Sequence, residues 1–180
     1  MPALRLSPAV AAWAQLAADL VNTAPRATHP HEQLRSAADV TALLARCPEP
    51  APAAAEADVA PMRALRPALR DAIEAADLSS FAAAVNPLLG RTATGWALAS
   101  AGDEWRLEPV TGATPAAWFG ARAARGLIEL ALAYGVDRLH VCSAGDCLRA
   151  VVDVSRNGGR RYCSRTCATR TNVRRHRAAR

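Results

Sequence analysis

The sequence predicts an α+β protein that is mostly helical, with a helical N-terminal unit containing one small β-hairpin and a compact cysteine-rich unit at the C-terminus. Alanine accounts for 44 of the 180 residues and aromatic residues for only 4%, a composition that favours helices over a β-sandwich. Apolar residues recur at helical spacing in most segments before residue 137. Four of the five cysteines fall within 26 residues near the C-terminus.

Five helices are expected in the N-terminal unit, because apolar side chains recur every three or four residues between capping residues. They span residues 8–21, 36–46, 62–73, 78–89 and 114–135. Ser36 is a favourable N-cap for the second helix, and Pro67 is a candidate for the true start of the third. Ser79 or Ser80 is expected to cap the fourth helix, which Gly90 closes.

Two irregular segments and one hairpin connect these helices. Residues 22–35 have no apolar periodicity and are expected to form a loop, whereas the proline-rich residues 48–60 are typical of a surface linker. Residues 92–110 alternate between apolar and other side chains, with a turn expected at residues 101–103. This alternation predicts a β-hairpin whose apolar residues are Trp96, Leu98, Trp105 and Leu107.

Charge is distributed unevenly along the chain. Residues 1–137 hold 11 arginines against 14 acids, a net charge of −3, whereas residues 138–180 hold 11 arginines against two acids, a net charge of +9. Nine arginines follow Asp153, and no acid does. A basic excess confined to one segment indicates a polyanionic partner. The change of sign divides the chain into an N-terminal domain, residues 1–137, and a C-terminal domain, residues 138–180.

The clustered cysteines predict a structural metal site. Two pairs, separated by 15 residues, are formed by Cys142, Cys147, Cys163 and Cys167. Pairs with such short internal spacing bind one tetrahedral zinc ion through four thiolates. Four thiolates saturate the metal, so a hydrolytic zinc mechanism is not expected. His140 is an alternative ligand, although a hydrogen-bonded strand residue is the preferred interpretation.

The residues around the cysteines predict a treble-clef-like finger. A turn at Gly145 and Asp146 joins the first pair, and residues 148–154 are β-prone. Residues 156–159 are a strong turn signal, after which residues 160–163 are expected to return as the second strand of a hairpin. Ser164 is expected to cap a terminal helix over residues 164–178, with Cys167 in its first turn.

Arginines of this finger are the candidate nucleic-acid contacts. They are Arg156, Arg160, Arg161, Arg165, Arg170, Arg174 and Arg177. Three of them, Arg170, Arg174 and Arg177, form one basic stripe along the terminal helix. Cys167 projects near the same stripe, so an open alternative is that Arg170 or Arg174 braces the zinc site instead of meeting a partner.

The C-terminal segment resembles the CGNR zinc-finger family of bacterial proteins. The resemblance is carried by Cys142, Cys147, residues 152–157, residues 160–164 and residues 167–170, where Ala168 and Thr169 replace the family's usual Gly and Asn. The N-terminal part is similar to the ABATE domain, described as a stress-induced transcription regulator, on residues 20–23, the 65–73 helix, residues 85–89 and the Trp118 helix. The resemblance implies a four-cysteine zinc site and a regulator of transcription.

The function predicted from these observations is zinc-dependent binding of double-stranded DNA by a cytoplasmic transcription regulator. The N-terminal domain is expected to sense a signal or to form a homodimer, and no enzyme activity is expected, because the chain has no nucleophile elbow, phosphate-binding loop or paired acid and base. The alternative is a zinc-stabilised module that binds RNA or protein and responds to thiol oxidation.

Overall fold

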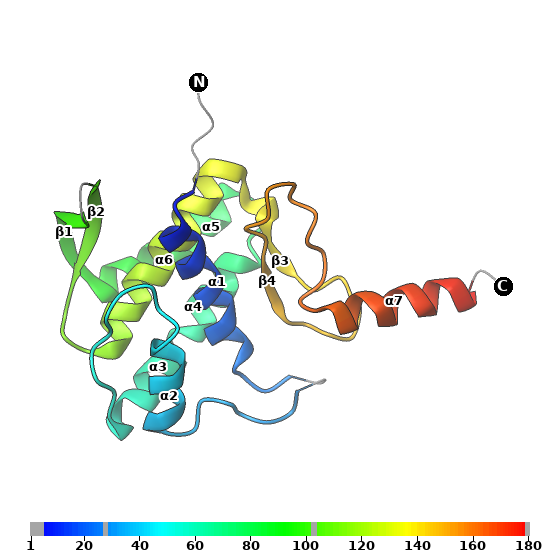
Figure 1. Cartoon of the computed structure of the whole chain (residues 1–180), viewed down its shortest axis with the longest axis horizontal. Coiled ribbons are helices and arrows are strands. Elements are labelled where there is room, and N and C mark those ends of the chain that lie inside the picture. Colours follow the sequence, from blue (N-terminus) through cyan, green and yellow to red (C-terminus); the bar gives the residue numbers. More distant parts are fainter. Residues whose placement is uncertain (1–5, 27–28, 102–103, 179–180) are drawn as a thin grey trace.

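The computed structural model describes residues 6–26, 29–101 and 104–178, and these form a mostly helical α+β protein, as predicted (Figure 1). The helical body comprises α1 (Pro8–Asn22), α2 (Ala37–Leu44), η1 (Glu56–Asp58), α3 (Val59–Ala64), α4 (Arg66–Ile73), α5 (Leu78–Thr92) and α6 (Pro115–Tyr134), followed by η2 (Val136–Arg138). Two hairpins, β1 (Ala93–Ala101) with β2 (Glu104–Thr111) and β3 (Leu139–Val141) with β4 (Ala150–Val152), and the terminal helix α7 (Arg165–Ala178) complete the described part of the chain. No helix there is long and apolar enough to cross a membrane.

The core is built where α1 crosses α6. Trp13 meets the edges of Trp118 and Phe119 with ring centroids 5.1 and 5.7 Å apart. The helices approach closely because Gly126 has no side chain: a Cβ there would lie 2.6 Å from the backbone nitrogen of Ala14. Thr114 caps α6 and Pro115 occupies its first turn, as the sequence predicts.

Two helices of the body differ from their predicted bounds. The helix expected over residues 62–73 is two helices, and the chain becomes helical from η1 onward, so the linker is shorter than expected. Val59 and Met62 are buried, which explains the early start. The cap of α5 is Asp77, which accepts a hydrogen bond from the backbone of Ser80. The helix continues past Gly90 because Thr92 is buried and its hydroxyl bonds the carbonyl of Leu88.

The first predicted hairpin is present. Strands β1 (Ala93–Ala101) and β2 (Glu104–Thr111) are antiparallel, with Leu98 opposite Leu107, and together form a two-stranded ribbon. The predicted turn at Gly102 and Asp103 lies outside the described residues. An ion pair of 2.5 Å between Arg125 of α6 and Glu108 holds the ribbon to the helical body.

The second hairpin differs from the predicted one. Strand β4 (Ala150–Val152) pairs with β3 (Leu139–Val141), which precedes the first cysteine, and residues 160–163 form no strand. The backbone groups of these residues have other partners, since the N–H of Arg160 binds the Asp153 carboxylate and the carbonyl of Arg161 accepts from Ser143.

The β3–β4 hairpin is packed into the helical body. Leu139, Ala150 and Val152 belong to the same buried cluster as the core of α1 and α6. The side chain of Asn22, at the end of α1, donates to the carbonyl of Ala150 at 2.9 Å and accepts from its N–H at 2.8 Å. The amide of Asn22 therefore pairs with β4 as a neighbouring strand would. The division of the chain into two domains, residues 1–137 and 138–180, stays a prediction.

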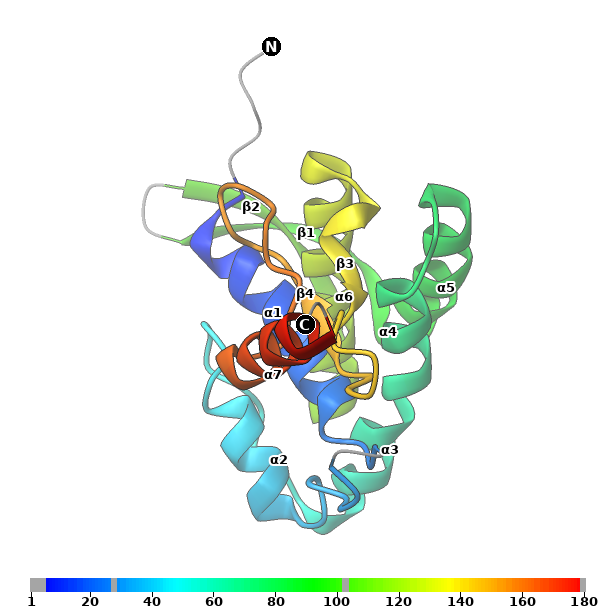
Figure 2. The same ribbon diagram turned by 90° about the vertical axis from the view of Figure 1, so that its right-hand side faces the viewer.

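Helix α7 (Arg165–Ala178) projects away from the body, and the turned view in Figure 2 shows it end-on toward the reader. Of its described residues only Cys167, in the first turn, is buried. Figure 1 places the β1–β2 ribbon at the opposite end of the molecule from α7.

Candidate metal centre and basic surface

Four thiols meet where the β3–β4 hairpin joins α7. The Sγ atoms of Cys142, Cys147, Cys163 and Cys167 all lie within 4.8 Å of one another. Cys147 is 3.5 Å from Cys163, and Cys167 is 3.6 Å from each of these two. A disulfide requires about 2.0 Å, whereas zinc–sulfur bonds of about 2.3 Å in a tetrahedron place the sulfurs about 3.8 Å apart. The thiols fit one structural zinc ion, as predicted.

Local hydrogen bonds position each ligand. The N–H of Cys142 binds the carbonyl of Arg149 at 2.8 Å, and the N–H of Cys147 binds that of Ala144 at 2.8 Å, which folds residues 142–149 into a tight knuckle. Leu148 closes this knuckle with a φ of 53°. At the second pair, Ser164 accepts from the N–H of Cys167 at 3.2 Å and so caps α7, as the sequence predicts.

Burial at this site disfavours thiolates that have no counter-charge. It raises the pKa of the Cys147 and Cys163 thiols, because a thiolate is costly to desolvate. A divalent metal reverses that cost, since coordinated thiols are deprotonated outright. The backbone N–H of Cys163 also points at the sulfur of Cys142, at 3.3 Å. His140 lies in β3 and is not part of the metal-binding group found in the described residues.

Two arginines of the predicted basic stripe are bound within the finger. The guanidinium of Arg170 is 2.6 Å from one carboxylate oxygen of Asp146, and that of Arg174 is 3.3 Å from the other. Arg170 also lies 3.9 Å from the sulfur of Cys167. Asp146 sits in the knuckle, so these ion pairs fasten α7 to the first cysteine pair. The alternative that Arg170 and Arg174 brace the zinc site therefore agrees with the structure.

Asp153 organises the loop that leads from β4 to the second cysteine pair. Its carboxylate is almost fully buried and accepts from the backbone N–H groups of Ser155 at 2.8 Å and Arg160 at 2.9 Å. Burial opposes ionisation, but these bonds and the nearby Arg138 hold the pKa of Asp153 below its usual value. Gly158 follows with a φ of +63°, and a Cβ there would lie 2.8 Å from the Arg138 guanidinium.

The guanidinium of Arg160 is also occupied inside the molecule. It donates to the side-chain oxygen of Gln15 in α1 at 2.9 Å and to the carbonyls of Val152 and Cys163 at 3.4 and 3.3 Å. The sequence suggests Arg160 as a nucleic-acid contact, and the structure instead gives it a bracing role between finger and body. Three of its five N–H donors can be satisfied by these acceptors, and its role as a nucleic-acid contact stays a prediction.

The remaining candidates are exposed. They include Arg156 in the loop after β4, Arg161 in the segment before α7, Arg165 at the start of α7 and Arg177 near its end, with Arg175 added by the structure. The face of α7 that points away from the thiols carries a second set: Arg165, Thr169, Asn172, Val173 and His176. Thr169, Asn172, Val173 and His176 also line a shallow hollow with Arg177.

Comparison with known families assigns both parts of the chain. Residues 14–134 match ABATE, described as "Putative stress-induced transcription regulator", and residues 138–180 match the CGNR zinc finger. The chain belongs to the ABATE family. No curated protein matches it. Ala168 and Thr169, which depart from the CGNR pattern, contribute no metal ligand: Thr169 is exposed and Ala168 is half-buried, whereas the retained Cys167 and Arg170 hold the site together.

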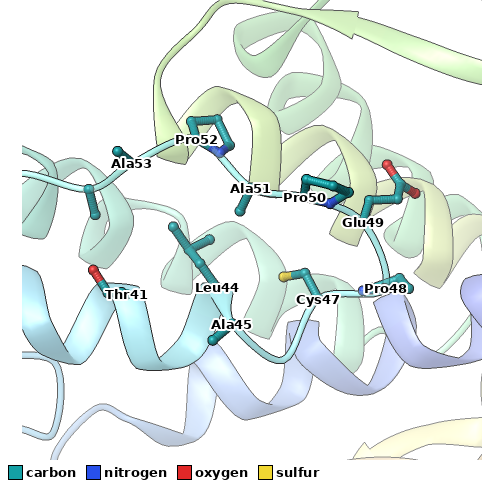
Figure 3. A pocket seen from close by; sticks show the side chains of 11 residues that line it. Thr41, Leu44, Ala45, Cys47, Pro48, Glu49, Pro50, Ala51, Pro52 and Ala53 are labelled. Carbon is teal, nitrogen blue, oxygen red and sulfur yellow. The ribbon is translucent and has the colours of Figure 1, made fainter.

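Cys47, the fifth cysteine, lies apart from the zinc ligands of this ABATE protein. It lines a hollow between the end of α2 and the proline-rich residues 48–54, where Figure 3 shows its sulfur beside Leu44 and below Ala51. Burial and the nearby Glu49 raise its pKa to about 12, so the thiol is protonated at neutral pH. Cys47 is half-buried, and a thiol that stays protonated is a poor nucleophile.

Three residues with structural roles in the finger do not stand out in the sequence as members of the site. Asn22 and Asp153 belong only to short strings shared with the family, and Asp146 is predicted only as a turn residue. The isolation of the two acids is itself a signal, because two carboxylates among 11 arginines are the natural internal acceptors of the segment.

Proposed function

We propose that this protein is a transcription regulator whose zinc finger binds double-stranded DNA. The observation that carries the proposal is the solvent-exposed arginine set around α7, in a segment where both acids, Asp146 and Asp153, already have internal partners. Arginines without a carboxylate to pair with repel one another until a polyanion compensates them. Five exposed side chains form this phosphate-contacting set: Arg156, Arg161, Arg165, Arg175 and Arg177.

The shape of α7 supports duplex DNA as the polyanion. Fourteen residues make a helix about 21 Å long, and this helix projects from the body with its outer surface uncovered (Figure 1). A single exposed helix fits the major groove, which is about 12 Å wide. The saturated zinc ion organises the finger and offers no position for a substrate, so the proposed role is binding and not catalysis.

The outer face of α7 is suited to reading bases. Thr169, Asn172 and His176 follow one another at helical spacing on the side opposite Cys167. Asparagine pairs with adenine through two hydrogen bonds, and a branched aliphatic residue such as the neighbouring Val173 contacts the thymine methyl group. This face is the proposed base-reading surface, because Arg170 and Arg174 on the other side of α7 are bound to Asp146.

The test begins with selection of a preferred sequence from a random duplex pool by the zinc-loaded full-length protein. Affinity for that sequence is then measured against salt concentration, where five phosphate contacts give a log–log slope of about −4.5. Arg161→Gln should reduce the slope by about 0.9 on every sequence. Arg91→Gln, which removes an exposed arginine of the helical body, is the matched control and should leave the slope unchanged.

A second variant separates base reading from phosphate binding. Asn172→Ala should weaken binding to the selected sequence by about 1–3 kcal/mol and leave non-specific binding and the salt slope unchanged. Binding that does not depend on salt, or tighter binding to RNA or to an acidic protein in competition, contradicts the proposal.

A further inference from the structure

The β1–β2 ribbon presents an apolar face that is buried at Pro109, near its base, and exposed to solvent over most of its length. Trp96 and Leu98 on β1 and Trp105 and Leu107 on β2 lie on this face, since Leu98 pairs with Leu107 and the tryptophans are two residues away on each strand. Their exposed fractions are 45%, 69%, 71% and 53%. Two of the four tryptophans of an aromatic-poor protein are thus in contact with solvent.

The ribbon has little support of its own. A two-stranded hairpin is only marginally stable in water unless another layer packs on it. The base of the ribbon is attached to the body by the ion pair between Arg125 of α6 and Glu108 of β2. Trp96 and Trp105 line an open hollow between the ribbon and the helical body, together with Val10 of α1 and Ile128 of α6. A second layer on this face would fill the hollow and cover both indoles.

We propose that the covering layer is the same ribbon of a second copy of this chain, so that the protein forms a symmetric dimer through Trp96, Leu98, Trp105 and Leu107. Each strand carries the order Trp-x-Leu, and the antiparallel register places the two leucines opposite each other at the centre. An isologous interface brings each residue near its own counterpart or a neighbour of that counterpart. Because both strands carry the order Trp-x-Leu, apolar side chains meet in both of these arrangements.

Charge and area both favour a second copy. The six register positions of this face, Trp96, Leu98, Ser100, Trp105, Leu107 and Pro109, carry no charge, so two copies meet no like-charge repulsion. The charged residues Arg106, Arg125 and Glu129 lie beside this face, in the lining of the hollow, and Arg125 is already paired with Glu108 and Glu129. The four large side chains expose about 500 Å² in total, which is more than half of the about 800 Å² that each partner buries in a standard interface.

The position of the face leaves both fingers free. The ribbon and α7 lie at opposite ends of the molecule (Figure 1), so dimerisation through the ribbon keeps the two strongly basic segments apart. Dimerisation does not depend on DNA, which makes its test independent of the proposed function.

The test is the oligomeric state of zinc-loaded full-length protein by sedimentation velocity over a range of concentrations. The wild type should be a dimer, and its tryptophan emission should shift to the blue as the dimer forms, because Trp105 leaves water. Leu98→Glu should raise the dimer dissociation constant at least about 30-fold, as loss of a central interface residue does. Leu132→Glu is the matched control, since Leu132 is 72% exposed on α6, outside the ribbon.

Zinc content and far-UV circular dichroism of both variants establish that they are folded. A wild type that stays monomeric at high micromolar concentration overturns the proposal. So does a dimer that Leu98→Glu leaves intact, or one that Leu132→Glu weakens equally. A monomer whose ribbon binds a different protein overturns the assignment to a second copy.

Discussion

Replacing Asn22 with alanine should weaken the attachment of the finger to the helical body. Asn22 is almost fully buried, and its amide makes both hydrogen bonds to the backbone of Ala150, at 2.8 and 2.9 Å. Each bond contributes about 1 kcal/mol net, and each backbone group of Ala150 left without a partner costs about 1–3 kcal/mol. Allowing for partial access of water to the space, the free energy of unfolding should fall by about 3 kcal/mol.

This loss is measured by urea unfolding of the zinc-loaded protein and by thermal melting, where it corresponds to a decrease in Tm of about 6–12 °C for a chain of this size. Asn172→Ala is the matched control, because it removes the same side chain from an exposed position on α7. It should change the free energy of unfolding by less than about 0.5 kcal/mol.

An Asn22→Asp variant separates the hydrogen bonds from the packing of the side chain. The carboxylate still accepts from the N–H of Ala150 but faces its carbonyl without a proton, so burial and this repulsion raise the pKa of the introduced acid in the folded state. A raised pKa means that the variant is most stable when protonated and loses stability as pH increases. Its deficit relative to wild type should therefore shrink between roughly pH 7.5 and 5.5.

A loss below about 1 kcal/mol in Asn22→Ala would refute the reasoning, because it would mean that water replaces both bonds without cost. A deficit in Asn22→Asp that is independent of pH would refute the assignment of the donor bond to the carbonyl of Ala150.

Three further outcomes follow from the same structure. Asp153→Asn should lower the free energy of unfolding at pH 7 by about 1–3 kcal/mol. Because the N–H groups of Ser155 and Arg160 outweigh the effect of burial, the pKa of Asp153 in the folded state is depressed. The difference in stability between variant and wild type, measured by urea titration, should therefore be complete above about pH 4 and should disappear as pH falls through that folded-state pKa. Gly126→Val should reduce stability by about 2 kcal/mol or more in thermal melts, because its side chain has no room against α1. Removal of zinc by a chelator should make the amide hydrogens of α7 exchange rapidly, while those of β4 stay protected because β4 is buried with the helical body. Equal loss of protection in α7 and β4 would contradict this.

Features that depend on a few neighbouring residues could be predicted from the sequence. Ser36 and Thr114 each start a helix because their hydroxyls accept from an N–H three residues later, a bond that needs no other part of the fold. The four zinc ligands were equally local, because each pair spans a short turn and the metal chemistry requires thiolates in that spacing.

The choice of strand partner could not be predicted in this way. Residues 139–141 form a strand too short to have a pattern of its own, so residues 160–163 were the better local candidate for pairing with β4. The actual pairing is decided by burial, since it places Leu139 and Val152 in the core of α1 and α6. Asp153 also contributes, because its carboxylate accepts a hydrogen bond from the N–H of Arg160, which therefore does not bond to a neighbouring strand. Both causes act across the tertiary structure.

The basic stripe illustrates the same limit for the site. Helical spacing correctly places Arg170 and Arg174 on one side of α7, but it does not say which side faces the knuckle. Asp146 lies 24 and 28 residues away in sequence, and only the fold brings its carboxylate to these two guanidinium groups. These two guanidinium groups are therefore bound within the finger, and Asn172 and His176 lie on the opposite side of α7.

The finger is fixed at two points that depend on different physical forces. Its hairpin is held by apolar burial and by Asn22, which do not require a metal. Helix α7 contributes only Cys167 to any buried cluster, and Asp146 is its one ion-pair partner among the described residues. Because surface ion pairs contribute little, zinc binding is the main interaction that fixes the orientation of α7. The metal is thus expected to control the proposed DNA-binding surface without controlling the fold of the body.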